Sequence, residues 1–121
     1  MKGYEFFLQF LKNEGFRTND EGNYFTFRFQ GNTFVVFKHD SRFLQVIQVI
    51  KAEGYTRSRL LETCDKLNDD KFVVKCTVHD NNIIWCCYET LPNEYTSSDD
   101  FELIMTLLDK STDEFYVMLR N

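Results

Sequence analysis

Four cysteines and two histidine–aspartate pairs are the residues of this chain whose types and spacing could support chemistry. Cys86 and Cys87 are adjacent, Cys76 precedes them on another apolar stretch, and Cys64 lies further upstream. Thiolates and imidazoles bind zinc, and a thiolate beside a cation can act as a nucleophile. The first question is whether these cysteines form a metal or redox site or pack in an ordinary core.

The spacing of these residues does not predict a metal site. A structural zinc site needs four converging Cys or His ligands, usually in two spaced pairs, and no such pairs occur here. Neighbouring residues of a strand point to opposite faces, so Cys86 and Cys87 would not bind one ion together. His39-Asp40 and His79-Asp80 occur where turns are expected, and both residue types are common in turns. We therefore predict no metal, no cofactor and no catalytic residue.

The positions of the cysteines depend on a hairpin predicted from strands over residues 71–78 and 82–91. With Asp80-Asn81 as its loop, Val78 pairs with Ile83 and Cys76 with Trp85, and a four-residue loop gives the same pairing. The face predicted to be buried holds Phe72, Val74, Cys76, Val78, Ile83, Trp85 and Cys87. The opposite face holds Val73, Lys75, Thr77, Ile84, Cys86 and Tyr88. Cys86 is thus predicted to be a surface thiol beside Lys75, and Cys87 a core residue.

Helical and strand periodicities predict the elements before this hairpin. Apolar residues three and four positions apart predict a helix over residues 4–14. Alternating phenylalanines then predict a hairpin whose loop is Gly31-Asn32, so that Phe29 faces Phe34 and Phe27 faces Val36. A β-branched stretch over residues 43–50 predicts a third strand.

Capping signals predict the remaining helices. Ser58 begins a helix over residues 58–68, which Asn68 ends in a left-handed conformation. Ser97-x-x-Asp100 resembles a capping box, and a second such signal starts at Ser111. The tail is therefore one kinked helix or two consecutive helices. The order α-β-β-β-α-β-β-α predicts an α+β fold, a two-layer sandwich with helices on an antiparallel sheet.

Composition limits the possible functions. With 121 residues the chain fits one domain, and 13 Phe, 6 Tyr and 1 Trp supply its core. The net charge of -5 disfavours nucleic acid, because a phosphate surface requires concentrated positive charge. No apolar run approaches the roughly 20 residues that span a bilayer. The first residues do not form a signal peptide, so we expect a cytoplasmic protein with reduced thiols and no membrane partner.

Residues 58–91, SRLLETCDKLNDDKFVVKCTVHDNNIIWCCYETL, resemble the YbjN-type family of bacterial sensory transduction regulators, whose domains look like type III secretion chaperones in fold. The resemblance rests on a helix that ends at Leu67-Asn68, a strand that starts at Phe72, a tight polar turn and a second strand that ends at Leu91. The first helix, its Gly15-Phe16 stop and the hairpin EGNYFTFRFQG fit the same layout, so the resemblance extends over nearly the whole chain.

The resemblance implies one secretion chaperone-like domain over residues 1–121, without catalytic residues. It implies a non-enzymatic intracellular protein, a homodimer that binds another polypeptide or modulates a regulatory pathway. The residues proposed to contact that polypeptide are Phe6, Phe10, Val73, Ile84, Cys86 and Tyr88. For the first helix an ordinary alternative is a broad apolar stripe buried between the sheet and the C-terminal helix. The alternative function is a small thiol-based sensor or enzyme that uses Cys86.

Overall fold

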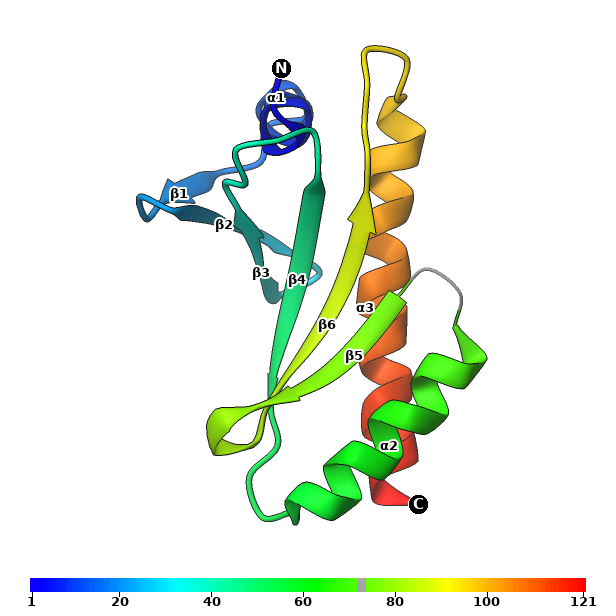
Figure 1. The fold of residues 1–121 in the computed structure, drawn as a ribbon. Coiled ribbons are helices and arrows are strands. Elements are labelled where there is room, and N and C mark those ends of the chain that lie inside the picture. The colour runs from blue at the N-terminus through cyan, green and yellow to red at the C-terminus, as the bar shows by residue number, and fades with distance from the viewer. Residues whose placement is uncertain (72–73) are drawn as a thin grey trace.

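The computed structural model describes residues 1–71 and 74–121, which form a six-stranded antiparallel sheet and three long helices (Figure 1). The strand order is β1-β2-β3-β4-β6-β5. In chain order the elements are α1 (Gly3–Asn13), β1 (Thr18–Asp20), β2 (Tyr24–Phe29), β3 (Asn32–Phe37), β4 (Leu44–Lys51), α2 (Arg57–Asp70), β5 (Val74–His79), the short 3₁₀ turn η1 (Asp80–Asn82), β6 (Ile83–Thr90) and α3 (Ser98–Arg120). The predicted α+β fold is confirmed, and the short edge strand β1 is an addition to the predicted order.

The helices lie on one face of the sheet. In Figure 1, α3 packs along β4 and β6, α2 crosses the C-terminal half of α3 obliquely and packs on β5, and the twist of the sheet carries β1–β3 away from both helices. At the other end of the sheet, α1 packs on the same face, because Phe7 lies between Phe27 of β2 and Phe101 of α3 with ring centroids 5.6 and 5.5 Å away. We call this side of the sheet the covered face and the opposite side the open face.

The loop of the β2–β3 hairpin differs from the predicted one. Gln30 and Gly31 form the two-residue loop, both with positive φ (54° and 78°), as a type I′ turn requires. Phe29 therefore pairs with Asn32 and Phe27 with Phe34, so the predicted pairings with Phe34 and Val36 are wrong. Because the shift is an even number of residues, each side chain still points to its predicted face.

Two predicted helix ends also change. The N-cap of α2 is Thr56, whose Oγ1 accepts a hydrogen bond from the Arg59 N–H at 3.1 Å, instead of Ser58. At its other end α2 continues past Asn68 to Asp70. In α3 the predicted capping box at Ser97 is present, and Ser111 is buried inside one continuous helix, so of the two alternatives for the tail the single helix is found and the two consecutive helices are not. Among the described residues, no helix has both the length and the apolarity to cross a bilayer.

Candidate functional site

The loop between β5 and β6 reverses the predicted positions of the cysteines. It contains three residues, Asp80–Asn82, and the left-handed conformations of Asn81 and Asn82 let His79 pair directly with Ile83. Three loop residues shift the register of β6 by one position from the prediction, and a shift of one turns every side chain of a strand to the other face.

Cys86 accordingly lies on the covered face and Cys87 on the open face. Cys86 pairs with Cys76 and has no exposed surface, so the predicted surface thiol beside Lys75 is wrong. Cys87 pairs with Lys75 instead, but neighbouring side chains leave only 4% of it exposed. Burial raises the pKa of the Cys87 thiol to about 12, which keeps it protonated at neutral pH.

Three thiols cluster on the covered face. The Sγ atoms of Cys76 and Cys86 are 2.7 Å apart, and Cys64 of α2 contacts Cys76 from the helix layer. Hydrogen bonds to Cys64 and Cys86, followed by burial, raise the pKa of Cys76 far above its ordinary value. These cysteines are at most 3% exposed. Among the described residues, no group of three His, Cys, Asp or Glu side chains is placed to hold a metal ion.

Most of the residues predicted to contact a polypeptide lie in the core or on the covered face. Ile84 and Cys86 are fully buried, and Phe10 is 7% exposed with its ring 5.2 Å from that of Phe101. For these three, the predicted exposure is wrong, and for Phe10 the alternative of a buried stripe holds. Ile84 and Cys86 are buried because the register of β6 is shifted by one residue from the predicted one. Phe10 is buried because α1 packs on α3.

The other predicted contact residues have different positions. Tyr88 is half-buried on the covered face, where it lines a hollow of about 200 Å³ next to Leu103 of α3. Phe6 is half-buried and lines a hollow of about 310 Å³ between α1 and the loop before α3. Val73 lies outside the described residues. The structure therefore does not gather the predicted residues into one surface.

A different surface, on the open face, gathers exposed apolar side chains. Its centre is a hollow of about 180 Å³, which we call the aromatic hollow. Its lining residues come from four strands and are all apolar or aromatic: Tyr24, Val35, Phe37, Ile47, Val49 and Trp85. Ile47 forms the buried floor, and the other five are partly exposed or exposed. Large apolar surfaces that remain in contact with water commonly mark interaction sites.

Aromatic contacts hold the hollow in shape. The Phe37 ring lies 6.0 Å from Tyr24 and 5.7 Å from Trp85, measured between ring centroids. Trp85 in turn stacks on His79 at 3.9 Å. The other histidine, His39, lies between Phe37 and Phe43 at 6.2 and 5.1 Å. Rings at these separations attract one another beyond their simple burial, so the hollow is preformed.

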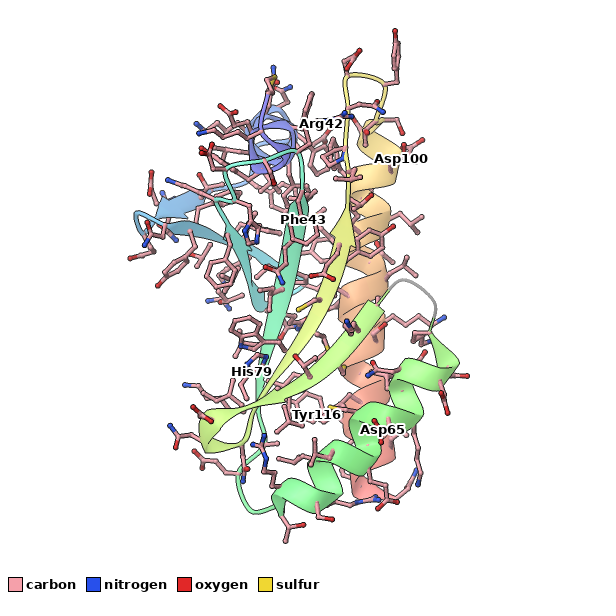
Figure 2. All side chains as sticks on the ribbon, viewed as in Figure 1. Arg42, Phe43, Asp65, His79, Asp100 and Tyr116 are labelled. Carbon is pink, nitrogen blue, oxygen red and sulfur yellow. The ribbon has the colours of Figure 1, made fainter. Side chains whose placement is uncertain are left out.

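Both histidines of this face have polar partners. His39 Nε2 lies 2.9 Å from Gln45 Oε1, and His79 Nε2 lies 2.8 Å from Thr77 Oγ1. Figure 2 shows His79 on the side of the sheet away from α2 and α3, whereas Asp65 and Tyr116 lie on the helical side. Ring stacking and these hydrogen bonds fix the orientation of the two imidazoles beside Phe37 and Trp85 of the aromatic hollow.

A signal for this surface was present in the sequence. β3 contains four consecutive apolar residues, Phe34 to Phe37, and alternation along a strand must then place apolar side chains on both faces. The same alternation puts Tyr24 and Val35 on the face of the hairpin opposite its buried phenylalanines. Trp85 was missed because the assumed loop length placed it in the core.

Comparisons with known proteins show similarity at the level of the fold. No family model matches the chain, and no curated protein matches its sequence. Among solved structures, an uncharacterized protein from Methanothermobacter thermautotrophicus is similar with a TM-score of 0.70 and 11% identity, over 98% of this chain and 96% of the other. YbjN from E. coli, described as a "putative transcription regulator", is similar with a TM-score of 0.70 and 12% identity, over 98% of this chain and 90% of the other.

Proposed function

We propose that the chain is a non-enzymatic regulatory protein that binds a polypeptide on the open face of its sheet. The observation that carries this proposal is the aromatic hollow, an apolar and partly exposed surface on the face opposite the helices. Burying such a surface releases about 25 cal/mol for each Å² of apolar area removed from water. The fold shared with YbjN supports a regulatory role.

The size and lining of the hollow favour a protein partner over a small molecule. Sites for drug-sized ligands usually enclose about 300–1,000 Å³ and contain a few converging polar groups. The aromatic hollow measures about 180 Å³ and has six apolar or aromatic lining residues, of which Tyr24 and Trp85 each carry a single polar side-chain atom. This volume suits one or two apolar side chains of a polypeptide that covers the surrounding face.

A photo-crosslinking amino acid at Val49 tests this function in the native cell. Val49 belongs to the aromatic hollow and is 37% exposed, while Leu103 of α3 is 51% exposed on the helical side and serves as the matched control. We expect one defined polypeptide to be crosslinked from position 49 and not from position 103, and the added variant Phe37→Ser to abolish the product. Absence of any product from position 49, or equal products from both positions, would overturn the proposal.

Cytoplasmic action and a homodimer remain part of the proposal. Reduced thiols in the buried cluster suit a reducing compartment. Light scattering of the purified protein tests the dimer, because a mass of 14.5 kDa at high concentration would identify a monomer. The two tests are independent, since a monomer could still hold a polypeptide on the open face.

A further inference from the structure

The edges of the sheet are poorly suited to pairing with a partner strand. At the β5 edge, the Asn68 side chain accepts a hydrogen bond from the Cys76 N–H at 2.7 Å and donates one to the Cys76 carbonyl at 2.9 Å. At the opposite edge, β1 has three residues, of which Asn19 and Asp20 are exposed and polar. A short polar edge strand and a side chain that occupies the backbone groups both discourage strand addition. A partner is therefore directed to the face of the sheet.

On the open face, an occupant must satisfy its own backbone hydrogen bonds. The strands already use their backbone groups within the antiparallel ladders, so the face offers apolar side chains in their place. An α-helix satisfies its backbone internally and has a diameter of about 10–12 Å with side chains. The residues that line the aromatic hollow come from β2, β3, β4 and β6, and four adjacent strands span about 14 Å. One helix therefore fits the width of this surface.

Charge around the hollow indicates which helix would bind. Of the charged residues that the described strands place on the open face, Arg28, Lys51 and Lys75 are basic and exposed, while Glu89 is acidic. Glu89 Oε2 accepts a hydrogen bond from Gln45 Nε2 at 3.1 Å. The ion pairs found among the described residues include none of the three basic side chains. The open face thus carries a basic rim on a chain whose net charge is -5.

From this complementarity we infer that the open face binds an amphipathic helix of a partner polypeptide, with an apolar stripe in the aromatic hollow and acidic residues against Arg28, Lys51 and Lys75. The inference rests on the proposed polypeptide-binding function and adds the conformation and charge of the bound segment. The apolar stripe of the helix would bury the aromatic hollow away from water. The acidic residues beside the stripe would favour this partner by electrostatic attraction to the basic rim.

Three synthetic peptides of about 18 residues, or five helical turns, provide the probes. The first has leucines at helical spacing with glutamates on both sides of the stripe, the second has lysines in place of the glutamates, and the third is the acidic peptide with a central proline. Trp85 is the only tryptophan of the protein and lines the hollow, so peptides without tryptophan can be titrated by its fluorescence.

We expect the acidic peptide to bind at least about tenfold more tightly than the lysine peptide and the proline peptide, because proline breaks the helix and lysines meet the basic rim. Lys51→Glu and Lys75→Glu should each weaken binding of the acidic peptide about fivefold. Lys110→Glu makes the same charge change on an exposed residue of α3 and should leave binding unchanged. Because the whole chain is acidic, binding elsewhere on its surface would favour the lysine peptide.

Equal affinity for the acidic and lysine peptides, or for the acidic and proline peptides, would overturn the inference. Self-association that shifts Trp85 emission with protein concentration would also overturn it, because a second copy would then occupy the face. If the crosslinker at Val49 captures a partner while the peptides show no preference, the proposed function stands and this inference alone fails. If position 49 captures nothing and no peptide changes the fluorescence, both fail.

Discussion

The two faces of the sheet are made from the same strands and similar residues, but they differ in what covers them. On β3, Phe34 points to the covered face and has no exposed surface, while Phe37 points to the open face and is partly exposed. The Phe34 ring stacks on Phe27 at 5.2 Å beneath the helices, and Phe37 contacts Tyr24 and Trp85 at the surface. The comparison teaches that apolar composition alone does not distinguish a core from an interaction surface in this sheet.

The largest expected difference between the faces is in stability. Phe34→Ala should lower the free energy of unfolding by about 3–5 kcal/mol, because it leaves a cavity in a fully buried site. Phe37→Ala should lower it by about 1–2 kcal/mol, because part of the ring is already in water. Urea denaturation of both variants measures the difference, and Phe34→Leu provides a milder variant if Phe34→Ala does not fold. Equal losses at the two positions would contradict the assignment of the covered and open faces.

A second expected effect concerns the β5 edge of the sheet, where the two faces meet. Asn68→Ala should lower the free energy of unfolding by about 1–3 kcal/mol, because both backbone groups of Cys76 lose their partner. The neighbouring exposed residue provides a control, Asp69→Ala, which should change stability by no more than about 0.5 kcal/mol. Urea denaturation measures both, and an Asn68→Ala variant as stable as its control would show that the edge does not depend on this side chain.

A third expected effect is the pH dependence of stability that the buried Cys87 thiol on the open face causes. Its pKa rises from an ordinary 9.0 to about 12 in the folded protein because the thiol is buried. Between these values the unfolded chain loses the proton and the folded chain keeps it, so the stabilisation present below pH 9 is lost as pH rises toward 12. In the parent protein this thiol should lower the free energy of unfolding by up to about 1.4 kcal/mol for each pH unit in this range, and Cys87→Ala should abolish that contribution. Parallel stability curves of the variant and the parent protein from pH 8 to 12 would contradict the raised pKa.

The smallest expected effect is a difference in labelling rate between adjacent cysteines. Both are buried, but Cys87 is covered by side chains of the open face, whereas Cys86 lies beneath the helix layer. Local side-chain movement should expose Cys87 before Cys86, because exposure of Cys86 requires the helices to open. We expect a maleimide on the native protein to modify Cys87 about tenfold faster, as measured by mass spectrometry of peptides. Faster modification of Cys86 would contradict the observed register of β6 and support the one predicted from the sequence.

Much of the fold follows from local patterns, and the candidate site does not. The phenylalanines of β2, the stripe of α1 and the capping box at Ser97 each depend on residues close in the sequence, so they were predictable. The same local rule misassigned Asn68, which resembles a helix end but bonds to a strand that follows it in the chain. Propensity describes what a residue can do, and the tertiary neighbours decide which option it takes.

The sequence by itself determined the class of fold, the two sets of alternating side chains on each strand and the spacing of the cysteines along the chain. Only the tertiary structure decided the register of β6, and therefore which of its apolar residues lie beneath the helices and which stay in contact with water. The physical reason is the period of two along a strand, which makes one extra loop residue between His79 and Ile83 sufficient to exchange Cys86 with Cys87 and to bring Trp85 to the open face.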